Sequence, residues 1–485
     1  MLVGINCNLK IINYKLKIEN KLLSFVKNTG LILSVLLLFL VPIKFGISVS
    51  NQTKIIVETP SSFLEWIFAQ YPNFLGQYLM TIIALCAVII LFFLNFKNFK
   101  SCNLNKNIIS TLVGWVLFSS AIIFSDFVLP GGGKFNNVNL QFLLYGAWFF
   151  SVLIFFKNKD SRIIAVLFIV AAGAIVCKEA VMQHFGGLEF VRQKVFTDAG
   201  FKSFADYTNF TLAVSKDIQT QKFIQKISSS RVFATFIYPN ALGGFIIILL
   251  PLCVGLFKSI KINFAKIFAV AVFILALVAL LFSKSKASIF ISALSLMALL
   301  WLAVRATQIP KRVLFGSGFL ACVIVIGMMF WGYGASGLAK KFKSTGGARI
   351  DYWKAAAKMI CENPWTGRGT DGFGKNYLAY KRPGAEDTQI PHNFILNIWV
   401  DYGIVAVIGI LLALVFPLYI SWKFFLKNKN AFDWLAVSCL VAGTGFILHC
   451  LVDFDFHTMG IVIPAIFAIV IANISRKILE KNVLS

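Results

Sequence analysis

Residues 349–403 read RIDYWKAAAKMICENPWTGRGTDGFGKNYLAYKRPGAEDTQIPHNFILNIWVDYG, and the rest of the chain is organised around this stretch. It is the longest polar interval in the C-terminal half, and strongly apolar runs close it at both ends. Functional side chains are often carried by loops that a rigid scaffold positions. We therefore expect chemistry on a lipid-borne or water-side substrate to take place here.

The composition is that of a membrane protein. Of the 485 residues, 58% are hydrophobic and only 14% are charged, whereas soluble domains carry about 25% charged residues. A soluble core of this length could not bury so much apolar surface, so we expect an all-α polytopic bundle in a lipid bilayer. The formal charge of +26 would suit nucleic-acid binding. The basic residues are spread over many short loops, however, as orientation signals are, so no nucleic-acid partner is expected.

A membrane span needs about 20 mostly apolar residues, and this criterion predicts about 12 spans in the chain. The predicted spans are 31–49, 77–96, 108–129, 140–156, 163–183, 233–256, 265–283, 286–304, 314–333, 400–422, 432–451 and 458–475. They define a transmembrane domain over 31–475, between a basic cytoplasmic segment at 1–30 and a cytoplasmic tail at 476–485.

The lysines and arginines of the short loops predict the orientation. With the N-terminus in the cytoplasm, every inner segment is basic and the short outer loops are nearly free of basic residues. The basic residues of the inner segments are Lys97, Lys100, Lys106, Lys157, Lys159, Arg162, Lys258, Lys261, Lys266, Arg305, Lys311, Arg312, Lys423, Lys427, Lys429, Arg476, Lys477 and Lys481. Both termini are therefore expected in the cytoplasm. Two long basic loops, at about 184–231 and 334–392, are expected outside, and the second is expected to be helical.

The start of the quoted stretch has helical spacing. Arg349, Trp353 and Ala356 fall on one face of a helix, and Lys354 and Lys358 fall elsewhere. One reading is an interfacial helix with a snorkelling arginine. The other is a helix that directs Arg349 at a ligand in the outer vestibule.

The segment Gly367–Gly374 imitates a dinucleotide-binding fingerprint. That fingerprint requires a strand before it and a helix after it in a βαβ unit, and this context is absent. A glycine-rich turn that places Arg368 and backbone amides near an anion is the preferred interpretation.

Three further groups of polar residues lie at span ends. His392 and Asn393 lie where the long loop re-enters the membrane, and the histidine is either a general base or an interfacial group bonded to the backbone. Arg231 precedes a segment with Pro239 and Asn240, which predicts a broken helix beside a wet or protein-lined cavity. Lys286 belongs to a short hairpin at 283–287 and either binds an anion or snorkels.

A cluster of two histidines and two carboxylates occurs at His449, Asp453, Asp455 and His457. These residue types could bind a metal, but their spacing matches no strong template, and no metal site is predicted. For Asp453 we expect a structural or charge-pairing role.

Together these features resemble the O-antigen ligase and polymerase superfamily of bacterial inner-membrane glycan transferases. The resemblance covers about 231–466 and is carried by the order and spacing of several short features. They are Pro239-Asn240, Ser285-Lys286-Ala287, Arg349 with Trp353, Pro364, Gly367, Gly369, Gly372, His392-Asn393, Gly403 and His449…Asp453…His457.

The resemblance implies transfer of a glycan from undecaprenyl pyrophosphate to an acceptor hydroxyl on the periplasmic face, without a metal or cofactor. It further implies that Arg231 and Arg349 bind or neutralise the pyrophosphate and that His392 assists the acceptor. Arg368, Asn240 and Asn393 are expected to contact substrate. The family usually has an arginine where this chain has Lys286, and lysine provides a point charge instead of a bidentate fork.

The acceptor stays open. It can be lipid A–core or another surface glycan, a growing polysaccharide, as for a polymerase, or a protein, as for an O-oligosaccharyltransferase. A secondary transporter is the alternative from another class. Such proteins tend to show repeat symmetry between their halves, and none is evident in this sequence.

Overall fold

The computed structural model of the chain describes residues 2–44, 73–98, 106–128, 137–214, 224, 227–236, 238–307 and 334–484. The regular elements in these ranges are all helical. They are α1 (Leu2–Lys44), α3 (Asn73–Asn98), α4 (Lys106–Val128), α5 (Asn137–Phe155), α6 (Lys159–Met182), η2 (Gln183–Gly187), α7 (Leu188–Asp198), α8 (Phe204–Val214), α10 (Pro239–Ser259), α11 (Asn263–Ser283), α12 (Lys286–Thr307), α14 (Gly334–Glu362), α15 (Gly372–Tyr380), α16 (Phe394–Ile410), η3 (Leu411–Val415), α17 (Phe416–Lys427), α18 (Trp434–Cys450), η4 (Asp455–His457) and α19 (Met459–Leu484).

The described helices confirm the all-α membrane architecture. Eight stretches are long and apolar enough to cross a membrane, and three shorter apolar helices accompany them. Together they coincide with the predicted spans except 314–333, which lies outside the described residues. The count of about 12 spans and the side of the membrane on which each loop lies therefore stay predictions.

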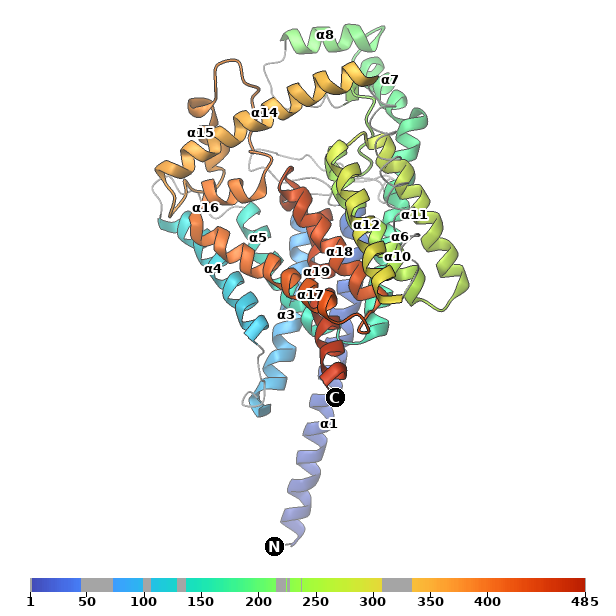
Figure 1. The fold of residues 1–485 in the computed structure, drawn as a ribbon. Coiled ribbons are helices and arrows are strands. Elements are labelled where there is room, and N and C mark those ends of the chain that lie inside the picture. Colours follow the sequence, from blue (N-terminus) through green and yellow to red (C-terminus); the bar gives the residue numbers. More distant parts are fainter. Residues whose placement is uncertain are drawn as a thin grey trace.

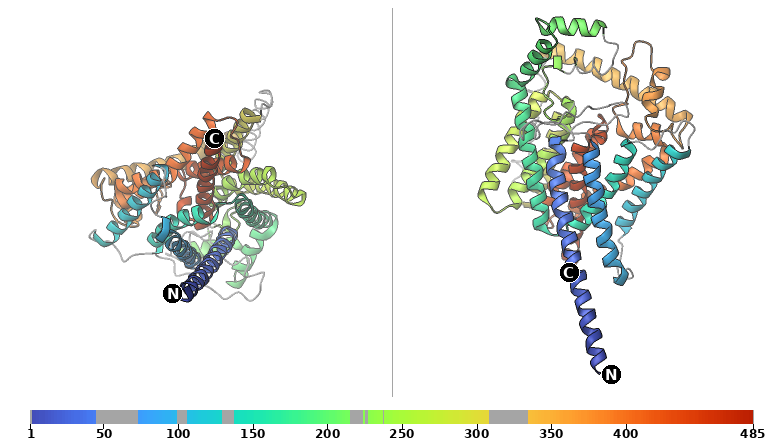
Figure 2. Two further views of the ribbon diagram at one scale, coloured as in Figure 1. Left: turned by 90° about the horizontal axis from the view of Figure 1, so that it is seen from below. Right: turned by 180° about the vertical axis from the view of Figure 1, so that it is seen from behind.

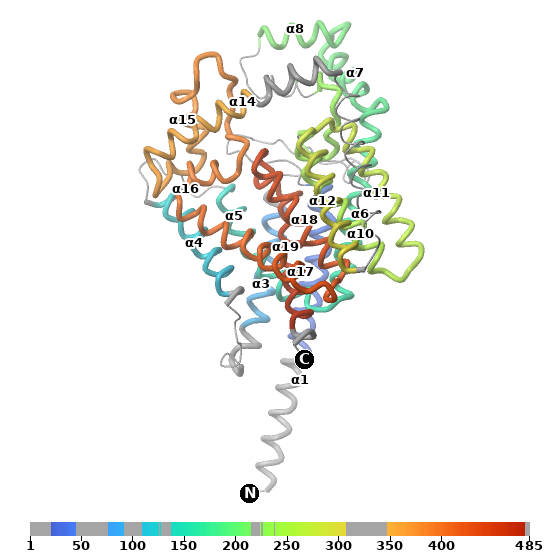
Figure 3. Tube along the Cα trace, viewed as in Figure 1, coloured from blue at the N-terminus to red at the C-terminus, as the bar shows by residue number. Residues whose placement is uncertain are grey.

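The bundle has two different ends. Figure 1 shows α7, α8, α14 and α15 at one end, while α19 finishes at the opposite end, where α1 also enters the bundle. The view from behind in Figure 2 shows the same two ends, the view from below in that figure looks along the bundle, and Figure 3 follows the Cα trace through it. We refer to the end that carries α14 as the α14 end.

Helices α10 and α19 form the centre of the bundle. In their apolar windows 83% and 94% of the residues are buried, against 33% in the peripheral α11. Helix α10 packs against α11, α12 and α18, and α18 packs against α19. Because α10 and α18 are adjacent, the chain segments at their α14 ends lie close together.

Some predicted span boundaries differ from the structure. Helix α16 begins at Phe394, where the predicted span began at 400. The helix predicted to begin at 233 begins instead at Pro239, which occupies a first-turn position that needs no amide donor, and residues 231–233 are not helical. The helix predicted to end at 183 does end there, because the backbone leaves helical geometry at Phe185 and Gly186. The predicted loop at 184–231 is partly helical, since it contains α7 and α8.

The long interval at the α14 end has a small core of its own. Tyr352, Ala356 and Met359 of α14 are buried against Phe373 and Tyr377 of α15. On the opposite face of α14, both Lys354 and Lys358 are exposed. The predicted helical face is thus confirmed, and the C-terminal part of α14 is packed against α15.

The glycine-rich segment completes the hydrogen bonds of a broken membrane helix. Helix α16 has a non-helical residue at Gly403, with φ +78° and ψ −179°. The amides of Arg368 and Gly369 donate to the carbonyls of Val400 and Asp401 at 2.8 and 2.9 Å. Since water is not there to satisfy such groups in a bilayer, the protein must supply their partners. The interpretation that the amides of this turn face an anion is therefore wrong for these two.

Replacing Gly403 by alanine should destabilise the bundle. A Cβ atom there would lie 2.0 Å from the carbonyl oxygen of Trp365, and the backbone conformation is one that L-residues rarely adopt. We expect Gly403→Ala to lower the free energy of unfolding by roughly 3 kcal/mol, from overpacking and backbone strain together. Gly347→Ala is the matched control, because a Cβ there meets open space on a helix. Denaturant unfolding in detergent, followed by circular dichroism, would contradict this account if both variants unfolded alike.

Candidate functional site

Asp453 is the centre of a polar cluster at the α14 end of the bundle. It lies in the turn between α18 and α19 and is 1% exposed. Its Oδ2 atom accepts a hydrogen bond from Asn240 Nδ2 at 2.7 Å and lies 3.4 Å from the guanidinium of Arg349. Its Oδ1 atom lies 3.5 Å from Nδ1 of His392. We call Arg231, Asn240, Arg349, His392 and Asp453 the Asp453 cluster.

The basic groups around Asp453 favour the ionised form of its carboxyl. Burial by itself would raise its pKa, but His392, His449 and Arg349 outweigh burial and hold the pKa of Asp453 below its usual range. A buried carboxylate therefore stands among basic groups, with a charge that these groups balance.

Arg231 is connected to Asp453 through one amide side chain. Its Nε donates to the carbonyl of Ser283 at 2.9 Å, and a terminal nitrogen donates to Asn240 Oδ1 at 2.8 Å. Since the other end of the Asn240 amide donates to Asp453, the three side chains form a continuous row. The row links the hairpin after α11 to the turn after α18.

His392 adopts an unusual backbone conformation. Its φ is +52°, in the left-handed region that costs a non-glycine residue about 1–3 kcal/mol. The imidazole lies between the rings of Tyr352 and Phe454, with centroid distances of 5.9 and 5.1 Å. Among the described residues neither ring nitrogen makes a hydrogen bond: Nδ1 is buried and only in ion-pair range of Asp453, and the side chain as a whole is 27% exposed. The ring thus has one nitrogen beside Asp453 and the other available to a ligand.

Helix α14 positions both Arg349 and His392. It carries Arg349, and one turn later the indole Nε1 of Trp353 donates to the carbonyl of Pro391 at 3.0 Å. Pro391 directly precedes His392, so the bond fixes the peptide that leads into the strained residue. The pairing of Arg349 and Trp353 on one helical face therefore places a cation and orients a histidine.

The other predicted site residues lie elsewhere. The guanidinium of Arg368 bonds to Glu362 and to the hydroxyl of Tyr380, over whose ring it is stacked. The side chain of Asn393 caps α16 by accepting from the amide of Leu396 at 3.1 Å. The structure does not bring these two side chains into the Asp453 cluster, and their contact with substrate stays a prediction.

Lys286 occupies the first position of α12 and is half-buried. It follows the turn at Lys284, whose φ is +50°, so the predicted hairpin at 283–287 is present. The carbonyl of Ser283 in this hairpin is the one that binds Arg231. Lys286 therefore belongs to the segment that supports the cluster, and its role toward an anion stays a prediction.

From the sequence we expected only a structural or charge-pairing role for Asp453, and no role for the rings of Tyr352 and Phe454 that flank His392. The expected charge pairing of Asp453 is confirmed, but the structure also makes this carboxylate the acceptor shared by residues from α10, α14 and the loop before α16. A signal was present in the sequence, because a carboxylate directly after an apolar run has a histidine four residues on either side. No sequence signal pointed to Phe454.

Comparison with known families supports the resemblance. The sequence model described as O-antigen ligase matches residues 271–411, which confirms the predicted relationship over this region. The matched region contains Arg349 and His392, whereas Arg231, Asn240 and Asp453 lie outside it.

One curated protein that is similar comes from Haemophilus influenzae and is described as uncharacterized. The two are 31% identical over 99 residues, which amounts to 19% of this chain and 24% of that protein. The alignment thus spans about a quarter of the relative's length.

The pH dependence of stability should carry a contribution from His457. Its Nε2 lies 3.1 Å from Asn397 Oδ1, and burial lowers its pKa to about 4, from about 6.5 in an unfolded chain. Below pH ~6.5 His457 binds a proton in the unfolded state but not in the folded state. The free energy of unfolding should therefore fall as the pH is lowered from ~6.5 towards 4. In thermal unfolding scans, His457→Gln, which can still donate to Asn397, should lose less stability across this interval. Equal losses would contradict the assignment.

Trp353→Phe should loosen the segment that carries His392. The substitution keeps an aromatic ring but removes the donor to the Pro391 carbonyl, and a lost hydrogen bond costs about 1 kcal/mol. We expect faster amide exchange around His392 and a matching loss of stability. Trp365→Phe is the control, because that indole is 73% exposed and has no hydrogen-bond partner among the described residues. Identical exchange in the two variants would refute the role of the indole.

Proposed function

We propose that this protein is a membrane glycan transferase of the O-antigen ligase type. The donor is a glycan on undecaprenyl pyrophosphate, the acceptor is a hydroxyl group, and the reaction takes place on the periplasmic face of the bacterial inner membrane. The observation that carries the proposal is the Asp453 cluster, which combines a histidine base with two guanidinium groups at one end of a membrane bundle. The match to the O-antigen ligase model supports it.

The cations suit a pyrophosphate leaving group. As the glycosyl bond breaks, negative charge grows on the departing phosphate, and preorganised cations stabilise it best where water is scarce. Arg231 is fixed by two hydrogen bonds, and Arg349 has a single contact with Asp453 at 3.4 Å among the described residues. Two guanidinium groups against one carboxylate leave a positive charge for the anion.

His392 suits the role of general base. Asp453 beside Nδ1 favours the tautomer with a proton on that atom, which leaves the lone pair of Nε2 for the acceptor hydroxyl. A base must come within about 2.6–3.2 Å of the proton that it removes. Nε2 is the ring nitrogen that points away from the Asp453 contact, and among the described residues no hydrogen bond occupies it. The strained backbone of His392 is the kind of local cost that folds retain at functional sites.

The bond changes balance in a single displacement. The acceptor oxygen forms a bond to the anomeric carbon of the donor, and the bond from that carbon to the pyrophosphate oxygen breaks. The acceptor proton moves to Nε2 of His392, and the electron pair of the broken bond leaves with the pyrophosphate. Pyrophosphate is a good leaving group, so no general acid is required, and direct attack inverts the anomeric carbon.

The proposal can be tested in proteoliposomes that contain the full chain and a pyrophosphate-linked glycan. The acceptors would be lipid A–core, a polysaccharide and a peptide, and the one that is glycosylated separates ligase, polymerase and protein transferase. We expect His392→Ala to lower kcat by about 10²–10⁴-fold, the usual contribution of a general base. Arg349→Lys should not restore the activity lost in Arg349→Ala, because lysine lacks the bidentate fork.

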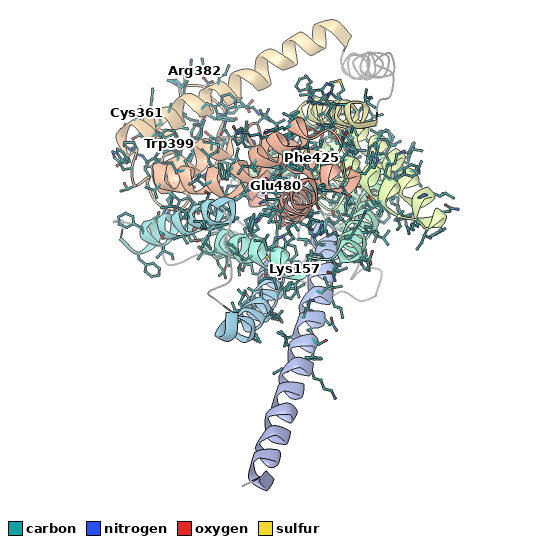
Figure 4. All side chains as sticks on the ribbon, turned by 60° about the horizontal axis from the view of Figure 1, so that its bottom comes forward. Lys157, Cys361, Arg382, Trp399, Phe425 and Glu480 are labelled. Carbon is teal, nitrogen blue, oxygen red and sulfur yellow. The ribbon has the colours of Figure 1, made fainter. Side chains whose placement is uncertain are left out.

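Arg382→Ala serves as the control for loss of an arginine from the same interval. Arg382 lies beside α14 (Figure 4) and is paired with Asp351 at the surface with its side chain 70% exposed. We expect it to keep full activity. Undiminished product from His392→Ala would refute the assignment of the base. Accumulation of a solute in the vesicles without glycan transfer would instead favour a transporter.

A further inference from the structure

A second row of polar side chains lies buried next to the Asp453 cluster. Ser285 Oγ is 2.8 Å from Ser288 Oγ, Ser288 Oγ is 2.9 Å from His449 Nε2, and His449 Nδ1 is 2.6 Å from Asp455 Oδ2. All four side chains are at most 2% exposed. We call these four residues the buried polar chain. It joins α12 to α18 and to the turn before α19.

Helix α10 closes over the buried polar chain through two consecutive glycines. A Cβ atom on Gly243 would lie 2.1 Å from Ser288 Oγ, and one on Gly244 would lie 2.0 Å from Asp455 Oδ2. Ser288 and Asp455 therefore occupy the space that the side chain of any residue other than glycine at positions 243 and 244 would fill. Because the buried polar chain is enclosed in this way, Ser288 and His449 do not contact a substrate directly. This holds although the pair resembles a nucleophilic serine with its histidine base.

Stability alone does not account for these residues. Replacing a buried ionic or ionisable pair by well-packed apolar side chains is often neutral or stabilising. Ionisable groups within a membrane bundle are costly and are by default a sign of function. The pair of His449 and Asp455 therefore calls for a functional reason.

Both ends of the buried polar chain lead to the Asp453 cluster. At one end, the amide of Ser285 donates to Ser283 Oγ at 3.3 Å, and the Ser283 carbonyl accepts from Arg231. At the other end, Asp455 follows Asp453 by two residues, and the ring of Phe454 between them contacts His392. The chain therefore connects the hairpin that holds Arg231 to the turn that holds Asp453.

We propose that the buried polar chain is a positioning device that fixes the hairpin at Arg231 relative to the turn at Asp453. This inference rests on the proposed function, in which the first element binds pyrophosphate and the second carries the partner of the base. With His449 neutral and its proton on Nδ1, the ring donates to Asp455 and accepts at Nε2 from Ser288, which in turn accepts from Ser285. Every donor then has one acceptor, so the row has a single direction and a fixed length.

The test compares Ser288→Ala with Ser292→Ala in the full-length protein. Ser292 lies one turn further along α12, is 3% exposed, and its Oγ has no hydrogen-bond partner among the described residues. Hydrogen exchange would be measured over the hairpin at 283–287 and the turn at 451–458, and donor KM and kcat would be measured in the transfer assay. We expect faster exchange in both segments and a KM raised roughly tenfold in Ser288→Ala, with a smaller change in kcat. Ser292→Ala should match the wild type.

A second pair of variants, Asp455→Asn and Asp455→Ala, separates loss of the hydrogen bond to His449 from general misfolding. Asp455→Asn keeps an acceptor for His449 and should leave the exchange of the hairpin near that of the wild type, whereas Asp455→Ala should loosen it. Unchanged exchange in Ser288→Ala and Asp455→Ala would overturn the inference, and so would loosened exchange with unchanged KM in an active enzyme. The exchange measurement needs no substrate. If the wild type transfers no glycan, the proposed function fails on that result, while the link between hairpin and turn is still decided by exchange.

Discussion

The site depends on one buried negative charge. Asp453 is enclosed by protein at the end of a membrane bundle, where an unpaired carboxylate would be very costly. Its oxygens are met by Asn240 from α10, by Arg349 from α14 and by His392 from the loop before α16. These elements are far apart in the sequence. The need to balance a single carboxylate therefore draws them into one place and leaves the remaining donors of Arg349 and the second nitrogen of His392 for a ligand.

A short turn distributes three polar residues to three separate networks. Asp453 pairs with the outer basic residues, Asp455 pairs with His449 inside the bundle, and His457 bonds to Asn397 of α16. The Asn397 amide donates in turn to Asp401 at 2.7 Å. Because the three residues alternate along the turn, neighbouring carboxylates point to different partners. A histidine and acid cluster that could suggest a metal site from its composition is thus divided among three hydrogen-bonded rows.

The bilayer imposes a second constraint, which acts on the backbone. The kink at Gly403 leaves carbonyl groups of α16 without helical partners, and amides of the glycine-rich segment supply them. The same docking sets α15 and α14 against α16, and the indole of Trp353 then holds the peptide before His392. The position of His392 therefore follows from the hydrogen bonds that the glycine-rich segment donates to the interrupted helix α16. Glycines that resemble a nucleotide-binding motif serve this purpose by allowing the close approach of two backbones.

The sequence by itself determined the membrane class, the helical architecture and most of the spans, because the length and composition of an apolar run decide whether it can cross a bilayer. It also pointed to Arg231, Asn240, Arg349 and His392, since polar residues at span ends are costly and few. Only the tertiary structure decided that Asn240, Arg349 and His392 meet at Asp453 and that Arg231 joins them through Asn240. Arg368 and Asn393 do not join this cluster. That distinction depends on which oxygen atoms lie beside each basic group or donor in space. Contacts between segments that lie far apart along the chain leave no pattern in one sequence. For the same reason the pairing of Ser288 with His449 could not be read from the chain: it exists only because two glycines of α10 leave room for it.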